Sequence, residues 1–302
     1  QFNYRVFGKS KISIMVLVNL FFFILRTRFR LQIGQIFANY WNLIFLKLAN
    51  KHTLINAITL YMQTMLKITF LIPVFNEQKT VVSSINQILN LKFSKKEIII
   101  IDNGSTDGSQ KLIRAFSGRK NIRIILRKKN LGYGASIKQG VRMAKGKYVF
   151  IQFSDTEYDH RVSLKMFKLS EKHNADAVFG SRLKNVSFKK KLVAIKNKPA
   201  FLATILITKI YNIFYNKNFT DVIGSKFYKV DVFKKINLKE NWLDWDFELK
   251  NRLISGPYKI LEIFTKYKPR PNSEEKSVKF YHMFLIIYLM VKFKLKILFR
   301  SF

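Results

Sequence analysis

The stretch KITFLIPVFNE, residues 67–77, decides the fold class together with EIIIIDNGSTDGS at residues 97–109. Each stretch holds a continuous run of apolar residues, which is typical of a strand buried on both faces. Each run ends in proline, glycine, asparagine or acidic residues that favour a turn. The two stretches therefore predict buried strands at 67–75 and 97–102.

Helix-like segments separate these strands from two more. Helical spacing of apolar residues predicts helices at 78–93, 109–116 and 135–144, and short apolar runs predict strands at 122–126 and 148–153. This alternation predicts an α/β fold with a mostly parallel sheet covered by helices on both faces. Because ligands bind outside the carboxyl ends of such strands, the polar residues that follow each strand are the candidates for chemistry.

The composition narrows the kinds of site that the chain can build. Its 302 residues, 48% of them hydrophobic, are enough for one large domain or two modest ones. The chain has no cysteine, which excludes disulfides and cysteine-ligated zinc or iron–sulfur centres. The 4 histidines are scattered, so a histidine metal cluster is not expected.

The chain is strongly basic, with 55 Lys+Arg against 18 Asp+Glu and a net charge of +37. Such a charge attracts phosphate-rich partners, although a general drift towards lysine is the alternative explanation. No nucleic-acid-binding module is recognisable, so we expect no nucleic acid partner. Since basic residues interleave with apolar runs at both ends, we expect attraction to a membrane surface.

Three regions differ in composition, since both ends are apolar and basic and the centre alternates strand-like and helix-like segments. They predict membrane-associating helices at 1–66, a central domain at 67–279 and an amphipathic membrane-interface helix at 280–302. The apolar run Ile12–Leu25 is short for a spanning helix, which takes about 17–25 residues, so it would lie in the interface or span only if extended. Core helices of a soluble protein are the alternative for both ends.

Acidic residues follow three of the predicted strands, in a chain that has few acids, and the first of them is Glu77 after the strand at 67–75. Asp102 ends its strand and is placed to accept hydrogen bonds from a ribose or a base. Asp155 and Glu157 follow the strand at 148–153 and carry the oxygen ligands that a hard divalent cation prefers. Turn formation and helix capping are the alternative roles, and we favour them for residues 105–109.

Four motifs resemble those of family 2 glycosyltransferases with the A-type fold: IPVFNE (72–77), IIIIDNGSTDGS (98–109), NLGYGASIKQGVRMAKGKYVF (130–150) and QFSDTEYDH (152–160). Later segments are similar to the dolichyl-phosphate mannosyltransferase-like branch, which transfers a hexose to a polyprenyl phosphate: FGSR (179–182), FTDVIGSKFYK (219–229), FELKNRL (247–253) and YKPRPNSEEKSVKF (267–280). The resemblance covers residues 67–285.

The resemblance implies a set of site residues. Asp155 and Glu157 would hold Mg²⁺ or Mn²⁺, and Asp155, Arg182 and Arg270 would be the catalytic group. Cationic side chains would clamp the donor pyrophosphate and the acceptor phosphate, namely Arg182, Lys226, Arg270 and Lys276. The nucleotide-sugar pocket would be lined by Pro73, Phe75, Glu77, Ile100, Asp102 and Ser154.

The resemblance further implies a membrane-associated enzyme with its catalytic domain on the cytoplasmic face, a nucleotide-sugar donor of the GDP-mannose or UDP-glucose type, and inversion at the sugar carbon. A lipid phosphate is already anionic, so catalysis would rest on positioning and charge stabilisation rather than on a general base.

Two departures from the family pattern keep other readings open. Phe153 stands where the metal loop usually has its first aspartate, and the proline expected near His160 is missing, so a catalytically degenerate, membrane-bound homologue is one alternative. Another is transfer to a sugar hydroxyl of a cell-surface glycan, which needs a carboxylate base. Asp244, Asp246 and Glu248 are candidates for that base, unless they are exposed acids on a helix that packs through Phe247 and Leu249.

Residues 4–11 (YRVFGKSK), followed by an apolar run, resemble the tail that follows the catalytic domain in this family. They predict that residues 1–30 are the remnant of an upstream related domain, with coincidence as the alternative.

Overall fold

The computed structural model describes residues 67–298 except 94, 188, 190–192, 194, 197–199, 243 and 269–281. The chain divides into two compact units, Gln1–Thr64 and Met65–Phe302, and all described residues belong to the second. The predicted helices at 1–66 and the predicted remnant at 1–30 lie outside the described residues.

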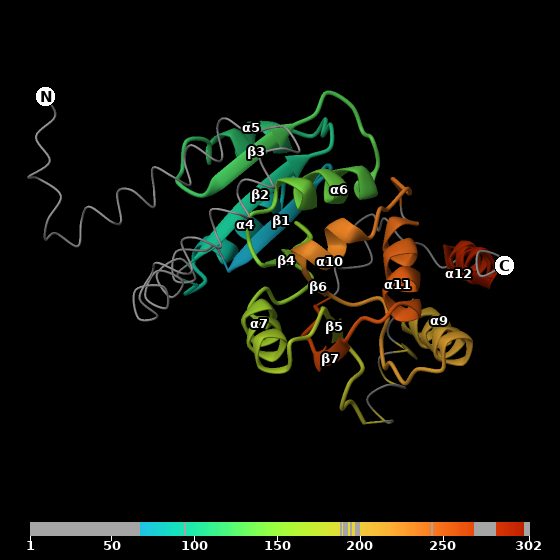
Figure 1. Ribbon diagram of the computed structural model, residues 1–302. Coiled ribbons are helices and arrows are strands. Elements are labelled where there is room, and N and C mark those ends of the chain that lie inside the picture. Colours follow the sequence, from blue (N-terminus) through green and yellow to red (C-terminus); the bar gives the residue numbers. More distant parts are fainter. Residues whose placement is uncertain are drawn as a thin grey trace, which may run out of the picture. The chain divides into compact units, whose positions relative to one another are not determined.

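A seven-stranded sheet in the order β3-β2-β1-β4-β6-β5-β7 forms the centre of this unit (Figure 1). Strands β1 to β4 run parallel to their neighbours in that group, whereas β6 is antiparallel to both β4 and β5, and β5 pairs parallel with β7. The strands are β1 Ile68–Val74, β2 Lys96–Asp102, β3 Ile122–Leu126, β4 Tyr148–Ile151, β5 Ala177–Ser181, β6 Lys226–Lys229 and β7 Ile260–Phe264.

Helices pack on both faces of the sheet, each over its own hydrophobic core. One face is covered by α4 Val81–Leu89, α5 Ser109–Arg114 and α7 Val162–His173. The other is covered by α6 Tyr133–Met143, α9 Ala200–Tyr215, α10 Val230–Lys235, α11 Trp245–Ser255 and α12 His282–Leu298. None of the described helices is long and apolar enough to cross a bilayer.

The continuous isoleucine run of β2 supplies both cores at once. Ile98 and Ile100 belong to the core under α4 and α5, and Ile99 and Ile101 belong to the core under α6. Successive side chains of a strand point to opposite faces, so a strand buried on both sides needs apolar residues at every position.

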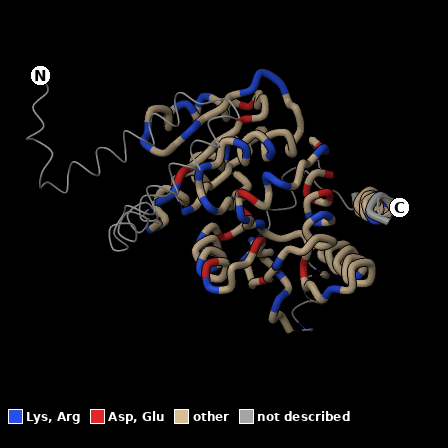
Figure 2. The backbone as a smooth tube through the Cα atoms, viewed as in Figure 1, with Lys and Arg blue, Asp and Glu red and all other residues tan. Residues whose placement is uncertain are grey.

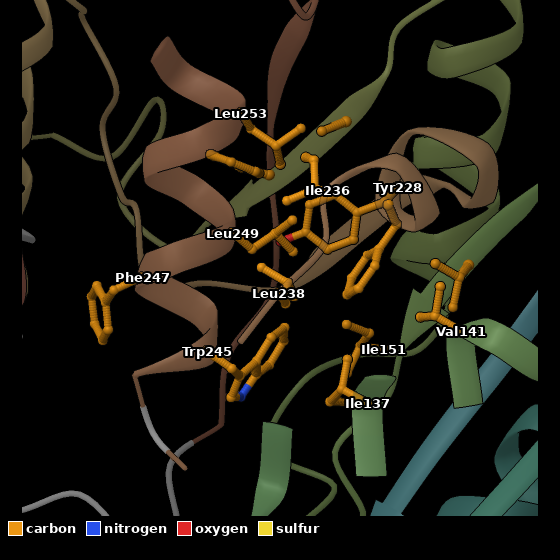
Figure 3. Close-up of a cluster of buried hydrophobic side chains, with 14 of the residues drawn as sticks. Ile137, Val141, Ile151, Tyr228, Ile236, Leu238, Trp245, Phe247, Leu249 and Leu253 are labelled. Carbon is orange, nitrogen blue, oxygen red and sulfur yellow. The ribbon is translucent and has the colours of Figure 1, made fainter. Parts of the chain in front are cut away.

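Helix α11 is joined to the sheet through the second core. Figure 3 shows Trp245, Leu249 and Leu253 pointing from α11 towards the region of α6 and β6. Gly134 of α6 makes this close approach possible, because a Cβ there would lie 2.7 Å from the Cβ of Trp245. The segment that begins α11 is thereby fixed beside the amino end of α6.

The mostly parallel sheet with helices on both faces is confirmed, as are the strands and helices predicted between residues 67 and 151. Two features differ from expectation. Strand β4 ends at Ile151 rather than at residue 153, and β6 inserts antiparallel between β4 and β5. The C-terminal helix packs one side on α9 and α11, and its membrane role stays a prediction.

Candidate functional site

The carboxyl end of β1 is the point at which two polar loops meet. The backbone N–H of Asn103, just after β2, donates to the carbonyl of Val74 at 2.8 Å. The hydroxyl of Ser154, in the loop after β4, lies 3.3 Å from the carbonyl oxygen of Pro73. The loops that carry Asp102 and Asp155 are thus tied to consecutive residues of the strand between them.

Asp102 is fully buried, and its two carboxylate oxygens have different surroundings. Oδ1 accepts hydrogen bonds from the backbone N–H groups of Gly104 (3.0 Å) and Ser105 (2.9 Å) and from Nε2 of Gln110 (2.7 Å). Oδ2 is buried and has no hydrogen-bond partner among the described residues. A buried carboxylate oxygen without a donor is costly, so Oδ2 is suited to a ligand hydroxyl or N–H.

The rest of this loop is held by turn contacts and by hydrogen bonds from the N–H groups of residues 76–78, whereas the expected side-chain cap of α5 is not formed. Asp107 accepts from the N–H of Ser109 (3.0 Å) and the N–H of Gln78 (2.9 Å), and these hydrogen bonds lower its pKa against the opposing effect of burial. Gly104 has φ +83°, and a Cβ there would lie 2.6 Å from the carbonyl carbon of Lys129, so only glycine fits.

Asp155 and Glu157 lie in the loop after β4. The N–H of Glu157 donates to Oδ1 of Asp155 at 3.0 Å, and Thr156 between them has φ +58°. Glu157 in turn accepts the hydroxyl of Tyr267 at 2.9 Å. Within the described part of the chain, no group of three or more histidines or acids is placed to hold a metal ion. The two carboxylates are the right kind of donor for a hard cation, but a ligand's phosphate oxygens and water would have to complete its shell.

Phe153 and Asp159 do not add to that donor set. The Phe153 ring packs 5.6 Å from the ring of Tyr133 and against the core. The carboxylate of Asp159 pairs with Arg161 at 2.8 Å, which lowers the pKa of Asp159, and accepts the Arg161 N–H at the start of α7. Asp159 therefore takes part in the turn before α7, which has no side-chain cap, and does not replace the missing aspartate.

Arg182 forms a buried ion pair that the sequence did not reveal. Its Nε lies 2.7 Å from Oδ2 of Asp221 and its Nη2 3.1 Å from Oδ1, and the guanidinium packs over the rings of Phe201 (5.3 Å) and Tyr267 (5.1 Å). Burial lowers the pKa of Arg182, but the carboxylate of Asp221 outweighs it and the pKa is raised. Part of the Arg182 guanidinium is thus already paired with Asp221. The expected contact of Arg182 with the donor pyrophosphate stays a prediction.

Tyr267 brings this ion pair next to the Asp155 loop. Besides its contacts with Glu157 and Arg182, it pairs with Tyr158 in a short bridge, with ring centroids 5.0 Å apart. Burial raises the pKa of Tyr158, and the charges of Arg182 and Asp155 both act on it. Asp155, Glu157 and Arg182 therefore share one electrostatic neighbourhood.

A buried cluster of two lysines and one carboxylate lies at the same sheet edge. Lys226 pairs in register with Ile151 at the end of β4. Its Nζ donates to the carbonyls of Ile223 and Gly224 and lies 3.8 Å from Oδ2 of Asp246. The fully buried Lys250 donates to the same Oδ2. Burial and the charge of Lys250 lower the pKa of Lys226, and Asp246 opposes them. Oδ1 of Asp246 is buried without a hydrogen-bond partner among the described residues.

The three acids at the start of α11 are not the exposed residues that one interpretation predicted, and that interpretation is wrong. Asp244, just before the helix, is only partly exposed, and its Oδ1 is buried without a hydrogen-bond partner among the described residues. Asp246 is mostly buried in the lysine cluster. Glu248 is buried and accepts the N–H groups of Lys239 (2.9 Å) and Glu240 (3.0 Å), with Arg252 at 2.8 Å. Glu248 is occupied by these contacts, whereas Asp246 lies 3.8 Å from Lys226, which pairs with the last residue of β4.

The remaining expected pocket residues differ in exposure. Phe75 is exposed at the end of β1, and Glu77 accepts the Thr80 hydroxyl at 2.7 Å. Pro73 is buried in β1 and offers its carbonyl to the site, whereas Ile100 is packed in the core behind Asp102. Arg270 and Lys276 lie outside the described residues.

Comparison with known proteins gives both a family and a fold. Residues 69–237, more than half of the chain, match glycosyl transferase family 2. The chain is 25% identical over 209 residues to poly-beta-1,6-N-acetyl-D-glucosamine synthase of Staphylococcus epidermidis, covering 67% of this chain and 48% of that protein. It is 31% identical over 115 residues to the glycosyltransferase GlyG of Streptococcus pneumoniae, covering 38% of each. The chain thus spans less than half of these two relatives.

Solved structures share the arrangement of the sheet and helices. Glucosyl-3-phosphoglycerate synthase of M. tuberculosis superposes with a TM-score of 0.51 at 15% identity, covering 76% of this chain and 80% of that one. The mannosyltransferase PcManGT of Pyrobaculum calidifontis, solved with GDP-Man and Mn²⁺, gives 0.50 at 14% identity, covering 68% and 58%. These likenesses show the fold, and the sequence match shows that the chain belongs to glycosyl transferase family 2.

Proposed function

We propose that this chain transfers a hexose from a nucleotide-sugar to a polyprenyl phosphate, with inversion at the sugar carbon. The observation that carries the donor half of the proposal is the buried Oδ2 of Asp102, which has no partner among the described residues. The three donors on Oδ1 fix the carboxylate, so Oδ2 can accept a ribose hydroxyl or a base N–H without reorganisation.

The pair Asp155 and Glu157 would receive the donor diphosphate. A divalent cation held there by carboxylate and diphosphate oxygens would neutralise charge on the departing nucleoside diphosphate. Glu157 is steadied by the Tyr267 hydroxyl and Asp155 by the N–H of Glu157, which orients both carboxylates before a ligand arrives.

The acceptor half of the proposal rests on the surplus of lysine at this edge. Lys226 and Lys250 are both buried, and they share the single carboxylate of Asp246. An added phosphate would favour the protonated form of Lys226, whose pKa is lowered by burial, because charge effects are strong where water is excluded. A phosphate oxygen is already anionic, so the acceptor would attack without a general base.

The motif that follows β7 is anchored beside the metal loop. The N–H of Lys268 donates to the carbonyl of Glu157 at 2.8 Å, and Arg270 follows two residues later. We propose that Arg182, Arg270 and Lys276 complete the binding of the two phosphates, on the cytoplasmic face of a membrane.

A second candidate function is transfer to a sugar hydroxyl of a cell-surface glycan. It is favoured by Asp246, whose carboxylate lies at the sheet edge where a general base would be needed, and by the similarity to a poly-beta-1,6-N-acetyl-D-glucosamine synthase.

Incubation of the purified chain with radiolabelled nucleotide-sugars, Mn²⁺ and membranes that contain polyprenyl phosphate tests both candidates. Label in the butanol-extractable lipid supports the lipid acceptor, label in polymeric glycan supports the second candidate, and no transfer from any donor means a degenerate homologue. Asp155→Ala should lower transfer about 10²- to 10³-fold. Asp159→Ala in the same loop is the matched control, because its carboxylate only pairs with the exposed Arg161.

A further inference from the structure

Helix α12 is apolar on two sides. Ile286, Leu289, Met290 and Phe293 are buried in the core shared with α9 and α11. The other side exposes Phe284 (65%), Leu285, Tyr288 (60%), Val291 and Leu295. A helix of a water-soluble domain normally turns polar residues to the outside. Packing within the described fold therefore does not explain this exposed apolar row of α12.

Helix α9 continues the exposed apolar surface. It packs against α12 (Figure 1). The ammonium of Lys294 lies 4.8 Å from the ring centroid of Tyr215 across this contact. Its exposed apolar residues are Leu202, Leu206 and Ile213 (78%), which form one stripe at helical spacing. The two helices thus carry eight of the thirteen exposed large apolar residues of the described chain. We call the exposed sides of the two helices the α9–α12 surface.

The charges of the α9–α12 surface have one sign. Lys209 lies exposed within the α9 stripe, Lys292 and Lys294 flank the α12 row, and neither helix contains an acid. Figure 2 shows how basic residues also outnumber acidic ones over the fold as a whole. Apolar side chains flanked by lysines fit the boundary between acyl chains and anionic headgroups, where lysine stems reach outwards.

We propose that the α9–α12 surface docks on an anionic lipid bilayer. A second copy of this chain is disfavoured as the occupant, because two chains of +37 would repel each other. The docking would hold the catalytic domain at the plane in which a lipid phosphate lies, and only that consequence rests on the proposed function.

The absence of cysteine from the 302 residues allows a local test in the intact chain. Ile213→Cys and Tyr288→Cys, each labelled with an environment-sensitive NBD group, report on the surface. Lys168→Cys is the matched control, since this exposed position of α7 lies on the opposite face of the sheet. Vesicles of phosphatidylglycerol and phosphatidylcholine in equal parts should raise the emission at 213 and 288 about twofold, with quenching by doxyl lipids, and leave 168 unchanged. Vesicles of phosphatidylcholine alone should have a smaller effect.

The proposal would be overturned by no response to vesicles at 213 and 288 or by an equal response at 168. A response to protein concentration without lipid, which indicates a second copy, would also overturn it. An apolar emission at 213 and 288 before lipid is added, unchanged by vesicles, would show that another part of this chain covers the surface, and would also overturn it.

The triple change Phe284→Ser, Tyr288→Ser and Leu295→Ser separates docking from catalysis. It should lower transfer to a long-chain acceptor in vesicles at least about tenfold while sparing transfer to a short, water-soluble prenyl phosphate. Equal loss with both acceptors would contradict the docking role. If the unaltered chain uses neither acceptor, the proposed function fails whatever the vesicle result.

Discussion

Replacement of Asp102 by asparagine distinguishes the structural role of Oδ1 from the proposed ligand-binding role of Oδ2. The amide oxygen of the new side chain can take the place of Oδ1 and keep the hydrogen bonds from Gly104, Ser105 and Gln110. The amide nitrogen then replaces the partnerless Oδ2, so an acceptor becomes a donor. Because the shape is unchanged, the loop should keep its conformation while its contact with the ligand is lost.

The size of the effect follows from the charge of the lost acceptor. A hydrogen bond to a charged group contributes about 1.5–3 kcal/mol. Every 1.4 kcal/mol is about a factor of ten in affinity, so donor binding should weaken about 10- to 150-fold. The three remaining hydrogen bonds become neutral, which should lower the free energy of unfolding by no more than about 2 kcal/mol.

The assay is titration calorimetry with UDP, GDP and their sugar conjugates, together with thermal unfolding. Asp107→Asn is the matched control, because both oxygens of Asp107 already accept hydrogen bonds within the loop, from Gln78 and Ser109. Donor affinity should be nearly unchanged in that variant. Equal affinity in Asp102→Asn and the unaltered chain would refute the reasoning, as would equal losses in the two variants.

Three further changes test the neighbouring groups. Asp155→Ala should lower turnover about 10²- to 10³-fold and remove the response of donor binding to added Mn²⁺ or to a chelator. If a chelator still weakens donor binding in this variant, the ion is bound by other residues. Phe153→Asp should strengthen that response but cost about 1–3 kcal/mol of stability, since the ring packs on Tyr133 in the core; unchanged Mn²⁺ affinity would contradict it. Asp221→Asn should destabilise the fold by about 3–5 kcal/mol, measured by urea unfolding, because it leaves Arg182 buried and unpaired. Burial raises the pKa of Asp221, but Arg182 outweighs burial and lowers this pKa below its ordinary value of 3.8. The ion pair therefore stabilises the folded protein above pH 3.8, and this stabilisation is lost as the pH falls through the lowered pKa of Asp221. The variant should lack this acid-dependent loss, and an identical acid profile would contradict the assignment.

The local pattern of apolar and turn-forming residues was sufficient to predict the secondary structure of the first half of the fold. Strands β1 to β3 and the residues that follow them could be predicted because each is a continuous apolar run that stops at a turn sequence. The placement of Asp102 and Asp155 at one edge followed from parallel strand direction alone. The four-residue strand β6 could not be assigned in the same way, because the direction of KFYK is set by its neighbours β4 and β5.

The contacts that distinguish the site were long-range and therefore hidden in the sequence. Asp221 lies 39 residues from Arg182, and nothing in either segment marks them as partners. The two lysines that share Asp246 come from β6 and α11, and only the fold reveals that they are buried. The outer row of α12 was visible as an apolar run, but its continuation on α9 depends on how the two helices pack.

A crystal structure of the chain with its donor nucleotide and Mn²⁺ tests the central claim most directly. We predict a ribose hydroxyl or base N–H within about 2.7–3.2 Å of Oδ2 of Asp102, with the diphosphate and the ion beside Asp155. A nucleotide bound away from the β1 end, with Oδ2 of Asp102 still lacking a partner, would contradict it.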